Sequence, residues 1–123
     1  MDFCIRKARV TDAEEINKVM KQAFADYEKE TCHSAAKGAL SETVEQTTED
    51  IKNKIFLVAE ADNCILGSVR VSMDCKDAYL SRFSVLSEYR QFGIGKSLIA
   101  EIDRILTDSG INSISLHTAY SLL

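Results

Sequence analysis

Two glycines late in the chain mark the segment whose residue types best suit chemistry. Gly93 and Gly95 stand within residues 87–97, between a strand-like run and a strongly helical one. Glycines remove side chains where a backbone must approach a ligand closely. The first turn of a helix adds free N–H groups and the positive end of the helix dipole. Together these features predict a phosphate-binding site, to which Arg90 and Lys96 add local positive charge.

Three glycine-loop patterns compete for this segment. A nucleotide triphosphatase loop reads G-x-x-x-x-G-K-[ST], and Gly95-Lys96-Ser97 supplies only its end, because position 90 is arginine. A dinucleotide-binding loop reads G-x-G-x-x-G, and Leu98 stands where its third glycine belongs. The third pattern, [RQ]-x-x-G-x-[GA], fits residues 90–95 (RQFGIG) at each defined position. The third pattern therefore describes the loop best.

Residues 90–95 resemble the cofactor loop of the GNAT superfamily, the acyl-CoA-dependent N-acetyltransferases. The strand and turn at 83–89 and the opening segment 5–13 also resemble that family. The resemblance covers nearly the whole chain and is specific from about residue 79 to residue 111. It implies a single GNAT-like N-acetyltransferase domain over residues 1–123. The implied fold is α/β, with a mixed and mostly antiparallel sheet that contains a parallel β-α-β unit for acyl-CoA.

The resemblance also implies that acetyl-CoA is the co-substrate. Backbone N–H groups of the loop would bind the pyrophosphate, and the edge of the preceding strand would pair with the pantetheine arm. The implied cofactor-binding residues are Phe83, Ser84, Val85, Arg90, Gln91, Phe92, Gly93, Ile94, Gly95, Lys96 and Ser97. The alternative interpretation is a tight structural turn whose glycines serve only packing.

Acetyl transfer needs a neutral amine, a polarised thioester carbonyl and a proton for the leaving thiolate. The resemblance implies that a backbone N–H near Val85 polarises the carbonyl. Tyr79 stands where the family often carries a carboxylate. Glu60 is a candidate to take the amine proton in its place, and the alternative is a solvated charge at a strand end. His117 is a second candidate, and the alternative is an ordinary residue of the sheet. Tyr120 lies near the family's general-acid tyrosine, although earlier in the chain.

The family usually continues past its last strand with another helix and further strands, and this sequence stops at Leu123. We therefore expect a GNAT-like fold that lacks its usual C-terminal part. A second copy of the chain could cover the sheet edge left exposed, which suggests a homodimer. Three functions stay open: an N-acetyltransferase acting on a small-molecule or peptide amine, a non-catalytic acyl-CoA-binding module, and a phosphate-binding domain of another kind.

The acceptor is not readable from the sequence. The resemblance implies that residues 27–55 shape its site, and that segment is rich in acidic residues. They are Glu28, Glu30, Glu42, Glu45, Glu49 and Asp50. An acidic lining would favour a cationic amine, but an exposed helix face has the same composition.

Composition and charge argue against several other classes. The chain has 123 residues, of which 46% are hydrophobic, and a formal net charge of -4. This charge gives no broad basic field for nucleic acid or for an anionic membrane. No apolar run approaches the roughly 20 residues of a membrane-spanning helix. Four cysteines without a paired spacing, and an N-terminus too polar for a signal peptide, indicate a cytoplasmic protein without a metal site.

Hydrophobic periodicity predicts the elements that would position the loop. The predicted strands cover residues 3–8, 55–60, 65–73, 79–86 and 111–118. The first predicted helix begins at Thr11, with Glu14 as its capping partner. A second covers 40–55 with a break near 47–48, and a third begins at Ile94 and is stopped by Gly110. Residues 31–40 are expected to be loop, and Gly67 to mark a bulge. Short turns make the middle strands antiparallel, whereas the helical crossover makes the last strand parallel to its predecessor.

Overall fold

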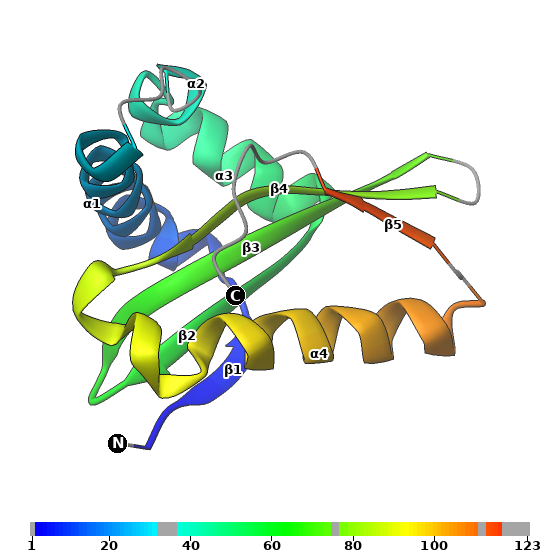
Figure 1. Ribbon diagram of the computed structural model, residues 1–123. Coiled ribbons are helices and arrows are strands. Elements are labelled where there is room, and N and C mark those ends of the chain that lie inside the picture. Colours follow the sequence, from blue (N-terminus) through cyan, green and yellow to red (C-terminus); the bar gives the residue numbers. More distant parts are fainter. Residues whose placement is uncertain (1, 32–36, 75–76, 111–112, 117–123) are drawn as a thin grey trace.

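The computed structural model describes residues 2–31, 37–74, 77–110 and 113–116 (Figure 1). Within them, one sheet has its five strands in sequence order. The strands are β1 (Cys4–Lys7), β2 (Ile55–Ala61), β3 (Cys64–Asp74), β4 (Asp77–Val85) and β5 (Ser113–Leu116). Neighbours from β1 to β4 are antiparallel, and β4 and β5 are parallel. The predicted mixed sheet is confirmed.

Helices cover both faces of this sheet (Figure 1). They are α1 (Ala13–Thr31), α2 (Lys37–Leu40), α3 (Val44–Asn53) and α4 (Ile94–Asp108). Side chains alternate between the two faces along each strand, so β2 serves both layers. Leu57 and Ala59 belong to the core under α4, whereas Phe56 and Val58 pack against Ile16 of α1.

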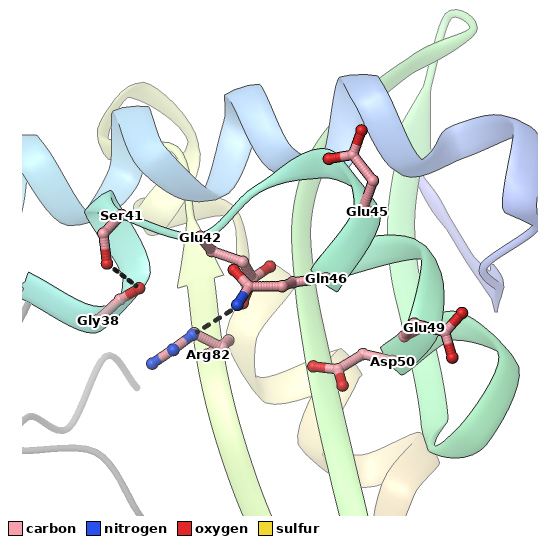
Figure 2. A pocket seen from close by; sticks show the side chains of 8 residues that line it. All are labelled: Gly38, Ser41, Glu42, Glu45, Gln46, Glu49, Asp50 and Arg82. Atoms are coloured by element: carbon pink, nitrogen blue, oxygen red, sulfur yellow. Dashed lines mark hydrogen bonds and ion pairs between the residues drawn. The ribbon is translucent and has the colours of Figure 1, made fainter.

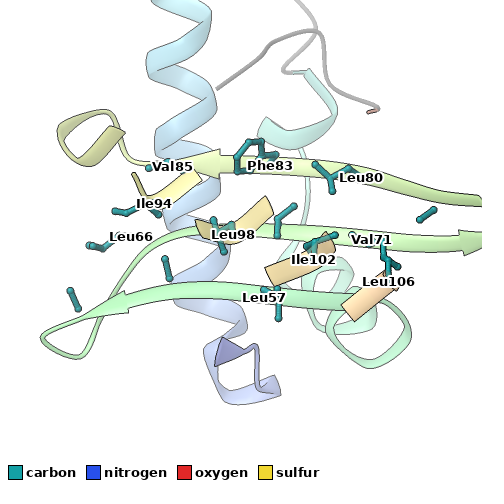
Figure 3. Packing of buried hydrophobic residues seen from close by; sticks show 14 residues of the cluster. Leu57, Leu66, Val71, Leu80, Phe83, Val85, Ile94, Leu98, Ile102 and Leu106 are labelled. Atoms are coloured by element: carbon teal, nitrogen blue, oxygen red, sulfur yellow. The ribbon is translucent and has the colours of Figure 1, made fainter. Parts of the chain in front are cut away.

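A single apolar stripe fastens α4 to the sheet (Figure 3). The stripe consists of Ile94, Leu98, Ile102 and Leu106, each exposed by 1% or less. These positions are four residues apart and therefore share one helix face, as the sequence predicted. Phe83 and Val85 of β4 belong to the same cluster. Because Ile94 is the first residue of α4, this packing holds the start of the helix against the end of β4.

The N-terminal turn of the first helix differs from its prediction. The chain enters α1 through a short 3-10 turn, η1 (Val10–Asp12). The backbone N–H of Arg9 donates to the Asp12 carboxylate at 2.8 Å, so the capping carboxylate is Asp12 and not Glu14. The predicted start at Thr11 was therefore wrong by two residues, with a different cap.

The segment between α1 and β2 is more helical than expected. α1 continues to Thr31 and α2 begins at Lys37, so part of the predicted loop at 31–40 is helix. α3 runs without the predicted break near Thr47. Its start is capped reciprocally: the Thr43 hydroxyl accepts from the Gln46 N–H at 3.1 Å, and the Thr43 N–H donates to the Gln46 side chain at 2.9 Å. This capping box was not identified in the sequence.

A bulge in β3 lies next to Gly67, and the same glycine lies close to the backbone of β4. The register of β2 with β3 shifts there, since Ala59 pairs with Gly67 and Glu60 with Ile65. A Cβ atom on Gly67 would lie 2.6 Å from the Ser84 carbonyl oxygen. The predicted bulge is confirmed, and the glycine is required by the close approach of β4.

Gly67→Ala should lower the free energy of unfolding by about 3 kcal/mol, because the added methyl group must displace the β4 backbone. Gly110→Ala is the matched control: Gly110 has a φ of +80° and no described atom lies within 4 Å of its added Cβ. This control should lose only about 1 kcal/mol from left-handed backbone strain. Urea unfolding measures both, and equal losses would contradict the close approach.

Candidate functional site

The glycine loop forms a short turn that leads directly into α4. After β4 the chain makes a 3-10 turn, η2 (Ser87–Phe92), which the sequence had not indicated. Gly93 follows with φ +79° and ψ 15°, a left-handed backbone conformation that residues with a Cβ atom adopt only under strain. The first helical hydrogen bond runs from the Ser97 N–H to the Gly93 carbonyl at 3.0 Å. The N-cap residue Gly93 has no side chain to cap α4, so it leaves the first backbone N–H groups of the helix without a side-chain cap.

The two cations of the loop have different surroundings. The Nε of half-buried Arg90 donates to the Val85 carbonyl at 3.4 Å, which ties the turn back to the end of β4. Lys96, in the first turn of α4, is exposed. The exposed ring of Phe92 lies near Tyr89, with ring centroids 6.3 Å apart. Lys96 is therefore the cation placed on the surface of the helix start, whereas Arg90 braces the loop.

The end of β4 presents backbone groups on its open side, where Arg90 already engages the Val85 carbonyl. Phe83 and Val85 are buried under α4, and Ser84 is buried against Ser68 on the opposite face. The Leu86 N–H donates to Leu66 of β3 at 2.9 Å. By strand alternation, the Val85 N–H points away from β3. Among the described residues, β5 pairs only with positions 77–80, so no described strand lies alongside 81–85 on that side.

A second bulge bends β4 at Arg82. The register of β3 with β4 shifts between Ser68–Ser84 and Arg70–Ser81, which leaves one extra residue on β4. Arg82 has a φ of +50°, a conformation that is uncommon for a residue with a side chain. Bulges of this kind redirect side chains and end regular pairing. The bend lies directly before the segment that the sequence implicated in cofactor binding.

An open pocket of about 610 Å³ lies between α2, α3 and β4 (Figure 2). It is lined by Gly38, Ser41, Glu42, Glu45, Gln46, Glu49, Asp50 and Arg82. Four of the six acidic residues singled out in the sequence therefore line one cavity. The side chains of Glu28 and Glu30 lie outside the described structure. Because Arg82 directly precedes Phe83, the pocket opens beside the end of β4.

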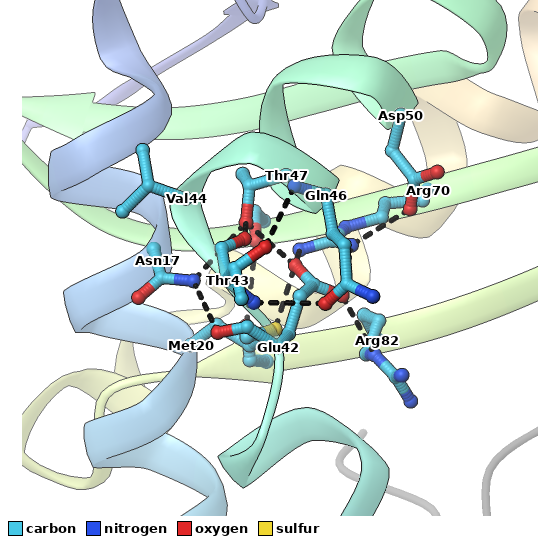
Figure 4. A network of polar contacts seen from close by, with 12 residues as sticks. Asn17, Met20, Glu42, Thr43, Val44, Gln46, Thr47, Asp50, Arg70 and Arg82 are labelled. Carbon is cyan, nitrogen blue, oxygen red and sulfur yellow. Dashed lines mark hydrogen bonds and ion pairs between the residues drawn. The ribbon is translucent and has the colours of Figure 1, made fainter.

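Behind the pocket lies a buried ionic network (Figure 4). The Glu42 carboxylate accepts from Nη1 and Nη2 of Arg70, each at 2.8 Å, and from the Thr47 hydroxyl at 2.6 Å. Arg82 Nε donates to the same carboxylate at 3.2 Å. Burial alone would raise the pKa of Glu42, but hydrogen bonds from Arg70 and Thr47 outweigh it and lower that pKa. Glu42 is therefore held as a carboxylate.

The sequence did not identify this network. The alternation of apolar and polar residues at 65–73 is typical of a half-buried strand, with Ser68 and Arg70 on the face opposite to Val69 and Val71. Both Ser68 and Arg70 are instead fully buried, because α1 packs against β3 and Asp50 of α3 contacts Arg70. The available signal was one arginine in the middle of a long strand, and periodicity alone gave it no partner.

The proposed proton-transfer residues are not grouped at the loop. Glu60 lies on β2, separated from β4 by β3, and accepts from Arg6 Nη2 at 3.0 Å. Arg6 also pairs with Asp12 at 2.8 Å. The hydrogen bond from Arg6 to Glu60 lowers the pKa of Glu60. A catalytic role for Glu60 stays a hypothesis. His117 and Tyr120 lie outside the described residues.

In the described part of the chain, no cluster of three or more potential metal ligands occurs. Of the helices described, none is long and apolar enough to cross a membrane.

Comparisons with known proteins agree with this geometry. A family model described as the acetyltransferase (GNAT) family matches residues 16–122. An uncharacterized N-acetyltransferase of Chlorobaculum tepidum is 29% identical over 122 residues, which cover 98% of this chain and 70% of that protein. The structure of PaiA N-acetyltransferase from Thermoplasma acidophilum, in complex with coenzyme A, has a TM-score of 0.84 at 22% identity and covers 96% of this chain and 80% of its own. A GNAT family acetyltransferase from Brucella melitensis, in complex with acetyl-CoA, has a TM-score of 0.76 at 27% identity, over 98% and 78% of the two chains.

Glu42→Gln should lower the free energy of unfolding at pH 7 by roughly 3 kcal/mol, because buried Arg70 loses its bidentate charge partner. The folded-state pKa of Glu42 lies below its ordinary value of 4.5. Its stabilisation is therefore complete above that value and is lost as the pH falls through the lower, folded-state pKa. Urea unfolding at pH 7 and pH 3 should show a smaller difference between variant and wild type in acid; an unchanged difference would contradict this role.

Proposed function

Because the chain belongs to the acetyltransferase (GNAT) family, we propose that it transfers an acetyl group from acetyl-CoA to a primary amine. The observation that carries the proposal is the uncapped start of α4 at Gly93, directly after the open backbone of β4. The relatives solved with coenzyme A and with acetyl-CoA support this choice of ligand. The amine is a small molecule or a peptide amine.

The first turn of α4 would bind the CoA pyrophosphate. Its N–H groups and the helix dipole favour an anion there, and exposed Lys96 adds a positive charge. The left-handed Gly93 removes a side chain at the point of closest approach. This local site explains how a chain of net charge -4 can bind a polyanionic cofactor.

The pantetheine arm would lie along residues 81–85, as if it were an added strand. The thioester carbonyl oxygen would accept a hydrogen bond from the Val85 N–H, which points away from β3. The amine lone pair attacks the carbonyl carbon, the C–S bond then breaks, and the sulfur leaves with the electron pair. The N–H near the carbonyl oxygen stabilises the charge that develops on it. The amine loses one proton in this step and the thiolate gains one.

The acceptor amine would enter through the pocket between α2, α3 and β4. Its lining residue Arg82 stands three residues before Val85, so the pocket and the proposed thioester position lie along the same strand, roughly 10 Å apart. A non-catalytic acyl-CoA-binding module is the second candidate function. The ion pair between Glu60 and Arg6 favours it, since this carboxylate is already engaged elsewhere.

Titration calorimetry should detect CoA binding to the wild-type protein, and Gly93→Glu should abolish it. The new carboxylate would occupy the phosphate site and repel its charge. Gly95→Glu should act in the same way. Gly110→Glu is the matched control, since Gly110 is also left-handed and lies at the opposite end of α4. No binding to the wild type at millimolar CoA would refute the proposal, and equal loss in the control would refute the assigned position.

A thiol-release assay with acetyl-CoA and a panel of primary amines should show amine-dependent release of CoA. Binding of CoA without release under any amine would instead establish the binding module. Competition between CoA and ATP tests the remaining alternative: displacement of CoA by equimolar ATP would indicate a general phosphate site.

A further inference from the structure

Arg70 is a fully buried cation in the centre of the sheet. Its side chain is 0% exposed, and among the described residues only Glu42 is another buried charged residue. Removing two charges from water is costly, and their attraction does not always offset that cost, so an apolar residue of similar volume often serves stability as well or better. The burial of Arg70 therefore suggests a task other than filling the core.

The contacts of Arg70 join β3 to Glu42 and Asp50, two residues that line the pocket (Figure 4). Its two terminal nitrogens grip the Glu42 carboxylate in a bidentate pair, and Nη1 also contacts Asp50 at 2.8 Å. The guanidinium stacks 4.7 Å from the Phe56 ring centre, and Nη2 lies 3.2 Å from the Met20 sulfur. A planar guanidinium with so many fixed neighbours has one orientation, so it sets the positions of both carboxylates.

Both carboxylates line the pocket, whereas Arg70 does not. Glu42 also holds Arg82 Nε at 3.2 Å, at the bend of β4. The backbone carbonyl of Glu42 accepts from Asn17 of α1 at 3.1 Å. Through Glu42, Arg70 thus fixes α3, the α2–α3 connection and Arg82 relative to one another. None of these contacts involves the loop at 87–97.

We propose that Arg70 is a positioning residue for the acceptor side of the site. It acts through Glu42 and Asp50, whose placement sets the shape of the pocket beside the bend of β4. This inference rests on the proposed function, and it assigns acceptor recognition to a buried residue that touches neither substrate. If so, loss of Arg70 weakens binding of the acceptor amine and leaves binding of the cofactor unchanged.

The first experiment compares Arg70→Met with the wild type, using acetyl-CoA and the amine of the panel that gives the fastest release. We expect the KM for the amine to rise by on the order of tenfold or more, because small misplacements of a site have effects of that size. The Kd for CoA, measured by calorimetry, should stay within about twofold, since the loop lies outside the network. Equal changes in the amine KM and in the CoA Kd would overturn the proposal.

Two further variants separate positioning from stability. Leu106→Ala removes buried packing at the far end of α4 and should lower the melting temperature without changing the amine KM. The double variant Arg70→Met/Glu42→Gln removes the stranded carboxylate charge, so its melting temperature should exceed that of Arg70→Met. The KM of this double variant for the amine should nevertheless stay raised, because Arg70 no longer fixes the pocket-lining segment. A KM that recovers together with stability would show that Arg70 is merely structural.

Hydrogen exchange tests the same assignment without turnover. In Arg70→Met, backbone amides of α3 should exchange faster than in the wild type, whereas those of α4 should not change. Equal acceleration in both helices would overturn the proposal. A wild-type protein that fails to bind CoA would refute the proposed function. The exchange rates of α3 and α4 in Arg70→Met would still decide whether Arg70 holds α3 in place.

Discussion

The packing of α4 across the sheet is the constraint on which the rest of the structure depends. Ile94, Leu98, Ile102 and Leu106 form one fully buried stripe, and this stripe starts at the first residue of the helix. A helix fastened at its first residue has a fixed N-terminus, so its free N–H groups and its dipole point to one place. Gly93 and the turn η2 then have to bring the chain from β4 to that place. The position of the proposed cofactor loop therefore follows from hydrophobic packing.

The opposite face of the sheet is covered in a different way. There α1 packs on the sheet through apolar residues, and Arg70 of β3 pairs with Glu42 of the α2–α3 connection and with Asp50 of α3. Burial of apolar area has little directional preference, so α4 is held in place by the close packing of its buried stripe. A bidentate ion pair allows one geometry and is costly to break once buried. The face that bears the pocket is therefore held by directional contacts, and the face that bears α4 by packing.

This division has a counterpart in the two halves of the site. On the proposed cofactor side, at the start of α4 and the end of β4, the groups available to a ligand are backbone N–H groups, together with glycines that expose them. Backbone groups are the same in every sequence, and TM-scores of 0.84 and 0.76 accompany identities of only 22% and 27% to structures holding coenzyme A or acetyl-CoA. On the pocket side, the available groups are side chains such as Glu45 and Arg82. Substitution there changes chemistry directly, so two members of one family can share a loop and differ in their pockets.

Much of this protein was readable from its sequence alone. The spacing of apolar residues predicted α4 and the strands, short turns predicted the antiparallel order, and the loop at 90–95 indicated the family that the comparisons then established. These features are local: helical periodicity, strand alternation and glycine conformation depend on residues close in the chain. The cap of α1, the unbroken α3 and the role of Arg70 were missed or misassigned. Arg70 reaches Glu42 across 28 positions and Asp50 across 20, and α1 turns a face that looked solvent-exposed into a buried one. Only the tertiary structure decided these points, because the free energy of a charged side chain depends on which distant groups replace its water.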